Sequence, residues 1–305
     1  MRVGLLEAAR RLRAGEPVAF PTETVYGLGA RPSDLAAVAR VFAQKQRPQF
    51  DPLIVHAADA ETAFGLSFPS DTAERLASAF WPGPLTLVLS RRTSVPDLVT
   101  AGLPTVGVRV PDHWMALALL RDVGPLAAPS ANPFGRISPT SAAHVEEGLG
   151  ADVPVVDGGP CRVGVESTVL WVQGAEVVLL RPGGIPVEQV SSLLGREVDR
   201  AVGNEIRSPG QLTSHYAPRT PVHLGDACPP GPRWGWIGIG QPTSLGWAAV
   251  ESLGDADVVA ATRLFSALRR LDAAGLDGIV AVEPPETGLY AAVADRLRRA
   301  AGRPC

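Results

Sequence analysis

The chain has 305 residues, of which 46% are hydrophobic and 19% are charged, and its formal net charge is −3. This length exceeds that of a typical single domain, so two domains are expected, with a sizeable core in at least the first. The composition is typical of a soluble globular protein, and no apolar run approaches the roughly 20 residues that span a bilayer. The slight negative charge disfavours a protein that binds bulk nucleic acid.

The amino-terminal segment predicts an amphipathic helix. Leu5, Leu6, Ala9 and Leu12 recur at helical spacing, and Gly15 supplies a stop signal. Charged residues interrupt this apolar stretch, which is typical of a helix and not of a signal peptide. A cytoplasmic location is therefore expected.

Short β-rich runs then alternate with helical patterns, which predicts one large α/β domain over residues 1–202. Ser33 and Asp34 can cap a helix that ends near Lys45. Strands are expected at 17–20, 53–56, 85–89, 106–110, 126–128, 153–156, 167–171 and 177–180, and further helices at 71–80, 113–121 and 139–149.

Residues 203–221 have prolines and glycines on both sides and predict an extended linker. The unit that follows, over residues 222–305, predicts strands at 234–239, 257–260 and 278–282 and helices at 262–274 and 286–301. This order fits a smaller, Rossmann-like α/β domain with a largely parallel sheet.

Several residue types are scarce and lie in short, turn-rich segments. Lys45 is the only lysine, and Asn132 is one of two asparagines. An ammonium is a compact point charge suited to a phosphate oxygen, so a lysine that survives a bias toward arginine indicates function. Chance survival on a solvated helix end explains a lone lysine equally well. The three cysteines are far apart and lack paired metal-ligand spacing, which predicts neither a disulfide framework nor a zinc site.

The run 20–29 follows the first strand and combines two threonine hydroxyls, a carboxylate and a phenol with two flexible glycines. Such a segment lets the backbone approach a ligand closely. An ordinary glycine-rich turn between a strand and a helix is the alternative, because the spacing of a Walker or dinucleotide loop is lacking.

Basic residues next to predicted strands are candidates for binding anions. Lys45 and Arg47 can neutralise a polyphosphate, whereas His56 either binds a small polar substrate or is an ordinary core histidine. Arg109 lies inside an apolar strand and needs an anionic partner, either an internal carboxylate or that of a substrate.

Two later segments add hydroxyl groups to the candidate site. Ser138 and the following proline have the form of a helix N-cap, where free N–H groups favour phosphate oxygens, although simple capping explains them too. The run 164–168 contributes another hydroxyl pair, and Arg181 ends another strand.

Taken together, the motifs at 21–29, 45–47, 52–56, 105–109, 129–132, 166–168 and 181–183 resemble the YrdC-type domain of L-threonylcarbamoyladenylate synthases. The run 208–218 and the small carboxy-terminal unit resemble the two-domain branch of that family. The resemblance covers nearly the whole chain and keeps order and spacing. It implies a nucleotidyltransferase that converts L-threonine, bicarbonate or CO2, and ATP with Mg²⁺ into threonylcarbamoyl-AMP and pyrophosphate. Partner proteins would then transfer the threonylcarbamoyl group to tRNA.

The resemblance also implies roles for individual residues, with Lys45 and Arg47 catalytic. It implies that ATP is bound by Lys45, Arg47, Asp51, Thr105, Ser130, Asn132, Ser138, Arg181 and Tyr216. It implies that threonine is bound by Thr24, His56, Arg109, the backbone of Ala128, and Ser167. Asp51 stands where the family usually has asparagine, and the sequence leaves open whether it binds through the metal or is turned away. The metal ligands stay unassigned.

Two other functions are compatible with parts of the sequence. Related domains in larger proteins are carbamoyltransferases that use carbamoyl phosphate and ATP, but this chain shows no accompanying domain for carbamoyl phosphate. A double-stranded RNA-binding module is the non-enzymatic alternative. The 18 basic and 22 acidic residues that precede position 206 give a net charge of −4, which disfavours a phosphate-binding groove.

Overall fold

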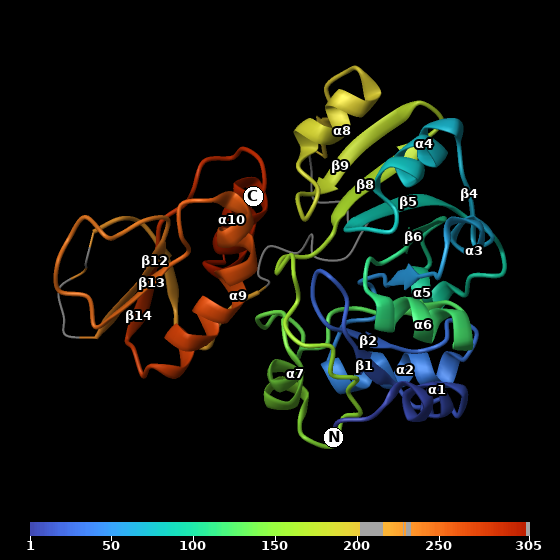
Figure 1. The fold of residues 1–305 in the computed structure, drawn as a ribbon, viewed down its shortest axis with the longest axis horizontal. Coiled ribbons are helices and arrows are strands. Elements are labelled where there is room, and N and C mark those ends of the chain that lie inside the picture. Colours follow the sequence, from blue (N-terminus) through green and yellow to red (C-terminus); the bar gives the residue numbers. More distant parts are fainter. Residues whose placement is uncertain (202–215, 228, 230–232, 303–305) are drawn as a thin grey trace.

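The computed structural model describes residues 1–201, 216–227, 229 and 233–302. Figure 1 shows two α/β lobes, which we call the large lobe (1–201) and the small lobe (222–302). The predicted linker over 203–221 lies mostly outside the described residues.

The large lobe is built on an eight-stranded sheet in the order β10-β9-β8-β5-β6-β3-β7, with β4 paired to β5. Its strands are β3 (Ile54–His56), β4 (Ser67–Phe68), β5 (Leu85–Arg91), β6 (Thr105–Arg109), β7 (Leu126–Ala127), β8 (Thr168–Gln173), β9 (Glu176–Arg181) and β10 (Asp199–Arg200). Parallel and antiparallel pairs alternate from β10 to β7, so the mixed sheet predicted for this lobe is confirmed.

Helices with one apolar stripe accompany this sheet, and side-chain caps define where several of them begin. Asp34 accepts a hydrogen bond from the Ala37 amide, and Ser70 from that of Ala73, which satisfies backbone donors at the helix starts. The helices are α1 (Leu5–Arg13), α2 (Leu35–Lys45), α3 (Ala60–Phe64), α4 (Asp71–Phe80), α5 (Asp97–Thr100), α6 (Trp114–Val123), α7 (Ala142–Leu149) and α8 (Val187–Leu194).

A separate hairpin pairs β1 (Val18–Phe20) with β2 (Gly27–Gly29). The sequence predicted that the run 20–29 leads from a strand toward a helix, but β2 intervenes and makes residues 21–26 a hairpin loop. The strand predicted at 153–156 is wrong, because Val155 forms only isolated bridges.

The small lobe contains a four-stranded sheet in which every pair is parallel, in the order β11-β14-β12-β13. Its elements are β11 (Val222–Leu224), β12 (Trp234–Gly238), β13 (Ala249–Ser252), α9 (Asp257–Ala273), β14 (Gly278–Ala281) and α10 (Tyr290–Ala300). The predicted parallel α/β arrangement of this unit is confirmed.

The strand predicted at 257–260 is wrong, because these residues form the first turn of α9. The valines at 258 and 259 favour a strand locally, but both are exposed, whereas Ala260, Leu264 and Leu268 recur at helical spacing and are buried. Tertiary burial therefore overrides local β propensity at this point.

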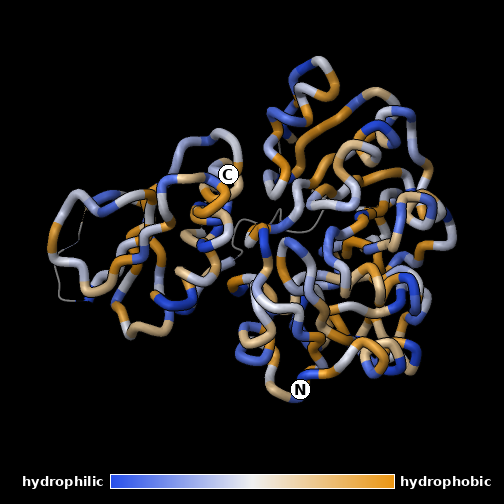
Figure 2. The backbone as a smooth tube through the Cα atoms, in the orientation of Figure 1, coloured by the Kyte–Doolittle hydropathy of each residue, from blue (hydrophilic) through white to orange (hydrophobic). Residues whose placement is uncertain are grey.

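The two lobes share one apolar cluster. Val25, Ile137 and Val165 of the large lobe pack with residues of α9 and α10. Figure 2 shows hydrophobic segments along the strands of both lobes and hydrophilic segments over much of the periphery. Among the described residues, no helix is both long and apolar enough to cross a membrane.

Candidate active site

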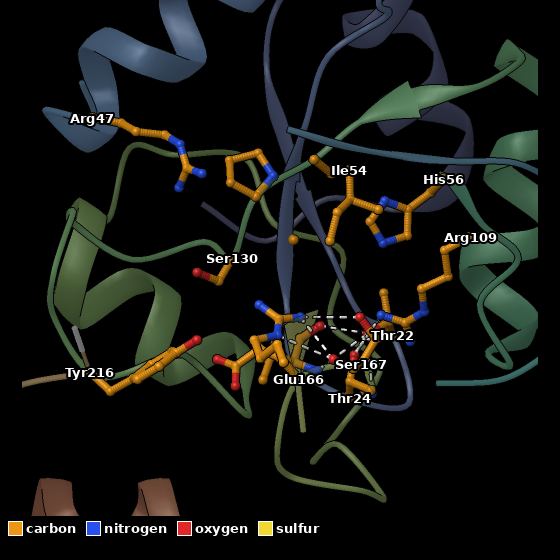
Figure 3. Close-up of a pocket in the computed structure, with 15 residues that line it drawn as sticks. Thr22, Thr24, Arg47, Ile54, His56, Arg109, Ser130, Glu166, Ser167 and Tyr216 are labelled. Atoms are coloured by element: carbon orange, nitrogen blue, oxygen red, sulfur yellow. Dashed lines mark hydrogen bonds between the residues drawn. The ribbon is translucent and has the colours of Figure 1, made fainter. Parts of the chain in front are cut away.

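A pocket opens where β3, β6, β7, β8 and β9 meet the hairpin loop (Figure 3). Mostly strand ends and loops line it, which is where a rigid sheet can present polar groups to a ligand. The lining residues are Thr22, Thr24, Val25, Gly27, Arg47, Ile54, His56, Arg109, Ala128, Pro129, Ser130, Glu166, Ser167, Arg181 and Tyr216.

The hairpin loop presents two hydroxyls to the pocket. The Thr22 and Thr24 hydroxyl oxygens lie 2.8 Å apart, and the Thr22 hydroxyl also donates to the carbonyl of Val25. These bonds fix the loop internally, so the hydroxyl of Thr24 is held beside Arg109, which donates to it at 3.0 Å.

His56 and Arg109 lie side by side because β3 and β6 pair in parallel with these two residues in register. Burial, together with the nearby Arg109 charge, lowers the pKa of His56 to about 3. Within the described part of the chain, Nδ1 of His56 has no hydrogen-bond partner. A neutral imidazole in the lining suits a polar ligand, since neutral imidazole both donates and accepts.

Glu23 is the internal partner of Arg109. Nη2 of Arg109 lies 2.7 Å from Oε1 of Glu23, and both side chains are buried. The two groups are close but not aligned as a hydrogen bond. Among the described residues, Nη2 of Arg109 and both carboxylate oxygens of Glu23 therefore have no hydrogen-bond partner. Of the two partners that the sequence left open for Arg109, the internal carboxylate is present, and N–H groups remain for a second anion.

We expect His56 to make the protein less stable in acid. Its imidazole has a pKa near 6.5 in an unfolded chain and about 3 when folded. Between these values the unfolded state binds a proton that the folded state lacks, so the free energy of unfolding falls by up to about 1.4 kcal/mol for each pH unit lost.

Urea unfolding at about pH 7 and about pH 4 measures this effect, with His56→Gln as the comparison. The native chain should lose more stability on acidification than the variant, which lacks the titrating ring. Equal losses of stability in the two proteins would contradict the lowered pKa of His56. An NMR signal of the His56 imidazole that titrates near pH 6.5 would contradict it as well.

Lys45 ends α2 and lies behind the pocket wall. Its ammonium is 1% exposed and donates to the carbonyl of Ser130 at 2.6 Å and to that of Asn132 at 2.5 Å. Burial, reinforced by the charge of Arg47, lowers the pKa of Lys45 well below its ordinary value. Lys45 thus holds the 130–132 segment in place from behind.

Arg47 extends from the same helix end into the pocket, and Asp51 holds its guanidinium. Nη2 of Arg47 lies 2.9 Å from Oδ2 of Asp51 and donates to the carbonyl of Pro52. Nη1 of Arg47 donates to none of the described residues. Asp51 is fully buried, is not among the lining residues, and has its carboxylate against Arg47.

Ser167 and Arg181 form the opposite wall. The Ser167 hydroxyl lies 2.7 Å from that of Thr86, and Nη2 of Arg181 donates to both the carbonyl and the hydroxyl of Ser167. Burial lowers the pKa of Arg181, but a guanidinium stays protonated in proteins. This wall therefore keeps a positive charge beside a hydroxyl.

Tyr216 lines the pocket from the segment that leads into the small lobe. Its ring is 1% exposed and packs against Phe265 of α9, with the ring centroids 5.7 Å apart. In Figure 3, Arg47 and Tyr216 lie on the side of the pocket opposite His56 and Arg109. The pocket therefore has a cationic and aromatic side and a side with a neutral imidazole and a paired guanidinium.

The pocket brings together nine of the residues that the sequence singled out and leaves five outside its lining. Lining the pocket are Thr24, Arg47, His56, Arg109, Ala128, Ser130, Ser167, Arg181 and Tyr216. Lys45, Asp51, Asn132 and Ser138 are buried behind it, and Thr105 lies at the other end of β6 from Arg109. Sequence reasoning missed Glu166 and Thr22 as lining residues, although both lie in segments it had identified.

The carboxylates near the pocket do not form a metal cage. The described residues contain no group of three or more His, Cys, Asp and Glu side chains arranged to hold a metal ion. Glu166 is the one acidic residue among the described residues of the lining, and its oxygens already accept bonds from Ser138 and Arg296. Mg²⁺ at a nucleotide is usually held by substrate phosphates and one or two carboxylates, and Glu166 is the carboxylate that this lining would offer such an ion.

Comparison with known proteins gives two family matches that together cover most of the chain. Residues 10–183 match the family model described as "Telomere recombination". Residues 185–302 match the model described as "Threonylcarbamoyl-AMP synthase, C-terminal domain".

Individual relatives extend over the same length. The chain is 42% identical to the threonylcarbamoyl-AMP synthase of Bacillus subtilis, covering 98% of this chain and 93% of the relative. It is 43% identical to that of Pyrococcus abyssi, covering 97% and 93%. The crystal structure of P. abyssi Sua5 complexed with L-threonine matches with a TM-score of 0.91 at 41% identity, covering 99% of this chain and 96% of that one.

Proposed function

The chain belongs to the threonylcarbamoyl-AMP synthase family in its two-domain form, and we propose that its pocket joins L-threonine, bicarbonate or CO2, and ATP into threonylcarbamoyl-AMP and pyrophosphate. One observation carries the assignment of the reaction to this pocket. Buried arginines and an aromatic ring face a neutral histidine and Arg109 within a single pocket. A nucleotide and an amino acid can therefore meet there.

We assign the His56 side to threonine. The α-carboxylate of threonine pairs with Arg109, whose N–H groups are not all used by Gly83, Thr24 and Glu23. The threonine hydroxyl suits the neutral imidazole of His56, which lines this side of the pocket. Ser167 and the backbone at Ala128 complete this side. The relative solved with L-threonine supports the choice of amino acid.

We assign the opposite side to ATP. Arg47 has Nη1 available for a phosphate oxygen, and Arg181 adds a second positive charge. Ser130 and Tyr216 contact the nucleotide in this proposal, while Lys45, Asp51, Asn132 and Ser138 hold the contacting groups from behind. Thr105 lies at the end of β6 away from Arg109 and does not line the pocket, so we assign it no direct contact with ATP.

The residues act mainly by position and charge. The carboxylate formed on the threonine nitrogen attacks the α-phosphorus while pyrophosphate leaves, so negative charge builds up between Arg47 and Arg181. Fixing both substrates between rigid strand ends makes this encounter effectively unimolecular. Mg²⁺, which we propose arrives with ATP, supplies further charge neutralisation. Transfer to tRNA by separate partner proteins and a cytoplasmic location remain part of the proposal.

Pyrophosphate release tests this function directly. The purified protein with ATP and Mg²⁺ should release pyrophosphate only when L-threonine and bicarbonate are both present, and mass spectrometry should detect threonylcarbamoyl-AMP. Release that requires carbamoyl phosphate instead, or indifference to threonine, would contradict the proposal. Binding of double-stranded RNA without nucleotide turnover would contradict it as well.

A further inference from the structure

Arg296 brings a buried positive charge from the small lobe to the wall of the pocket. It lies in α10, its side chain is fully buried, and its Nε donates to Oε2 of Glu166 at 2.8 Å. Its Nη2 donates to the carbonyl of Pro182, and Nη1 pairs with Asp295. The guanidinium carbon lies 4.8 Å from the centroid of the Tyr216 ring. One side chain thus contacts two residues that line the pocket.

The lobe interface is packed closely enough to hold this contact. Gly164 has a φ of +80°, and a Cβ added there would lie 2.4 Å from Cα of Thr262 in α9. Across the same interface, the Thr262 hydroxyl donates to the carbonyl of Arg162 at 3.1 Å, and Arg269 donates to that of Ile137 at 2.7 Å. α9 and α10 therefore pack closely against the large lobe and form hydrogen bonds with it.

Glu166 is the residue whose charge needs this partner. It lines the same pocket as Arg47 and Arg181, where the proposed function brings a polyphosphate. Oε1 of Glu166 accepts from the Ser138 hydroxyl, and Oε2 accepts from Arg296. A carboxylate without its cation at this place would repel phosphate, and in a buried setting such repulsion is strong.

Electrostatics around Arg296 favour a permanent charge. Burial alone would lower the pKa of Arg296, but Tyr216, Glu166 and Asp295 together raise it above its ordinary value. Arg299 shares Asp295 with it, at 3.1 Å. Asp295 therefore remains a partner for Arg296 when Glu166 is altered, which makes Glu166 variants usable as tests.

We propose that Arg296 is a positioning residue for the nucleotide half of the site: it neutralises Glu166 and supports the ring of Tyr216, so the small lobe completes the ATP pocket within one chain. This inference rests on one part of the proposed function, namely that ATP binds on the side of the pocket that contains Arg47 and Tyr216. It assigns the small lobe a part in substrate binding that does not depend on a separate partner.

Calorimetric measurement of ligand affinity tests the role of Arg296 in nucleotide binding without requiring the reaction to proceed. Arg296→Met should weaken binding of α,β-methylene-ATP by about tenfold or more, because the unpaired Glu166 charge then faces the phosphates. Binding of L-threonine alone should change less than about twofold, since Arg296 contacts none of the groups assigned to threonine. Arg298→Met is the matched control on the same helix, because its partners are Glu283 and Glu286, and both affinities should stay native.

A second substitution tests the electrostatic cause. Glu166→Gln added to Arg296→Met should restore most of the affinity for the ATP analogue, whereas a merely structural role predicts that the two changes worsen each other. Equal weakening of ATP-analogue and threonine binding, or no rescue, would overturn the proposal.

If Arg296→Met does not fold, Arg296→Lys tests the same charge from the opposite direction. Lysine keeps the charge opposite Glu166 but cannot also reach the Pro182 carbonyl and Asp295 in one fork. Because the charge opposite Glu166 is kept, Arg296→Lys should retain most of the affinity for the ATP analogue, and a loss as large as that expected for Arg296→Met would overturn the proposed neutralisation of Glu166. Pyrophosphate release by the native chain tests the proposed function separately, so the two can fail independently.

Discussion

Replacing Arg109 with methionine is expected to abolish threonine-dependent pyrophosphate release and to lower the stability of the fold. The change removes the proposed partner of the threonine carboxylate and leaves Glu23 as a buried charge without its cation. Breaking a buried ion pair in this way typically costs about 3–5 kcal/mol. Threonine binding by calorimetry and urea unfolding measure the two effects separately.

A surface arginine provides the control for this change. Arg162→Met removes a guanidinium whose side chain is 67% exposed and whose partner is Asp112, so activity and stability should stay near those of the native chain. The double variant Arg109→Met with Glu23→Gln should regain stability but not threonine binding. Threonine-dependent activity retained in Arg109→Met would remove this residue from the proposed site.

Replacing Lys45 with arginine is expected to reduce activity by roughly a hundredfold while the overall fold is kept. The ammonium donates to the carbonyls of Ser130 and Asn132 in a fully buried position. A planar guanidinium is larger and cannot converge on both oxygens in the same way, so the segment that carries Ser130 should move. A displacement of about 1 Å at a site of this kind costs on the order of a hundredfold in rate.

Gln44→Arg controls for adding an arginine to this helix end, because position 44 is exposed. Initial rates of pyrophosphate release and thermal unfolding compare the two variants with the native chain. Near-native activity in Lys45→Arg would mean that the single lysine of this sequence survived by chance. Loss of cooperative unfolding would mean that its role is to support the fold.

Much of the architecture follows from local sequence patterns. The helix at 71–80 is bounded as predicted, because Ser70 caps it and its apolar residues recur at helical spacing. The strand that ends at His56 was also predicted, and the strand predicted at 106–110 lies one residue earlier, at 105–109, since short apolar runs between turn signals indicate buried strands. Motifs with fixed order and spacing also led to the family, which the family matches confirm.

Local patterns misled where burial was decided by distant residues. The valines at 258 and 259 predicted a strand, but α9 forms there because its buried face packs against the sheet of the small lobe, α10 and part of the large lobe. Val153–Val156 has high β propensity, yet its only ladder partners are isolated bridges to Arg2 and Ala19. The helical spacing of Ala260 with Leu264 and Leu268 was the signal against the first strand, whereas residues 153–156 contain no comparable signal.

The sequence by itself determined which segments form the pocket, because their residue types and spacing are local properties of the chain. Only the tertiary structure decided which charges meet. It paired Arg109 with Glu23, turned Asp51 toward Arg47, and brought Arg296 from the other lobe to Glu166. The physical reason is that the energy of a buried charge depends on its neighbours in space, and those neighbours lie up to 130 positions away in the chain.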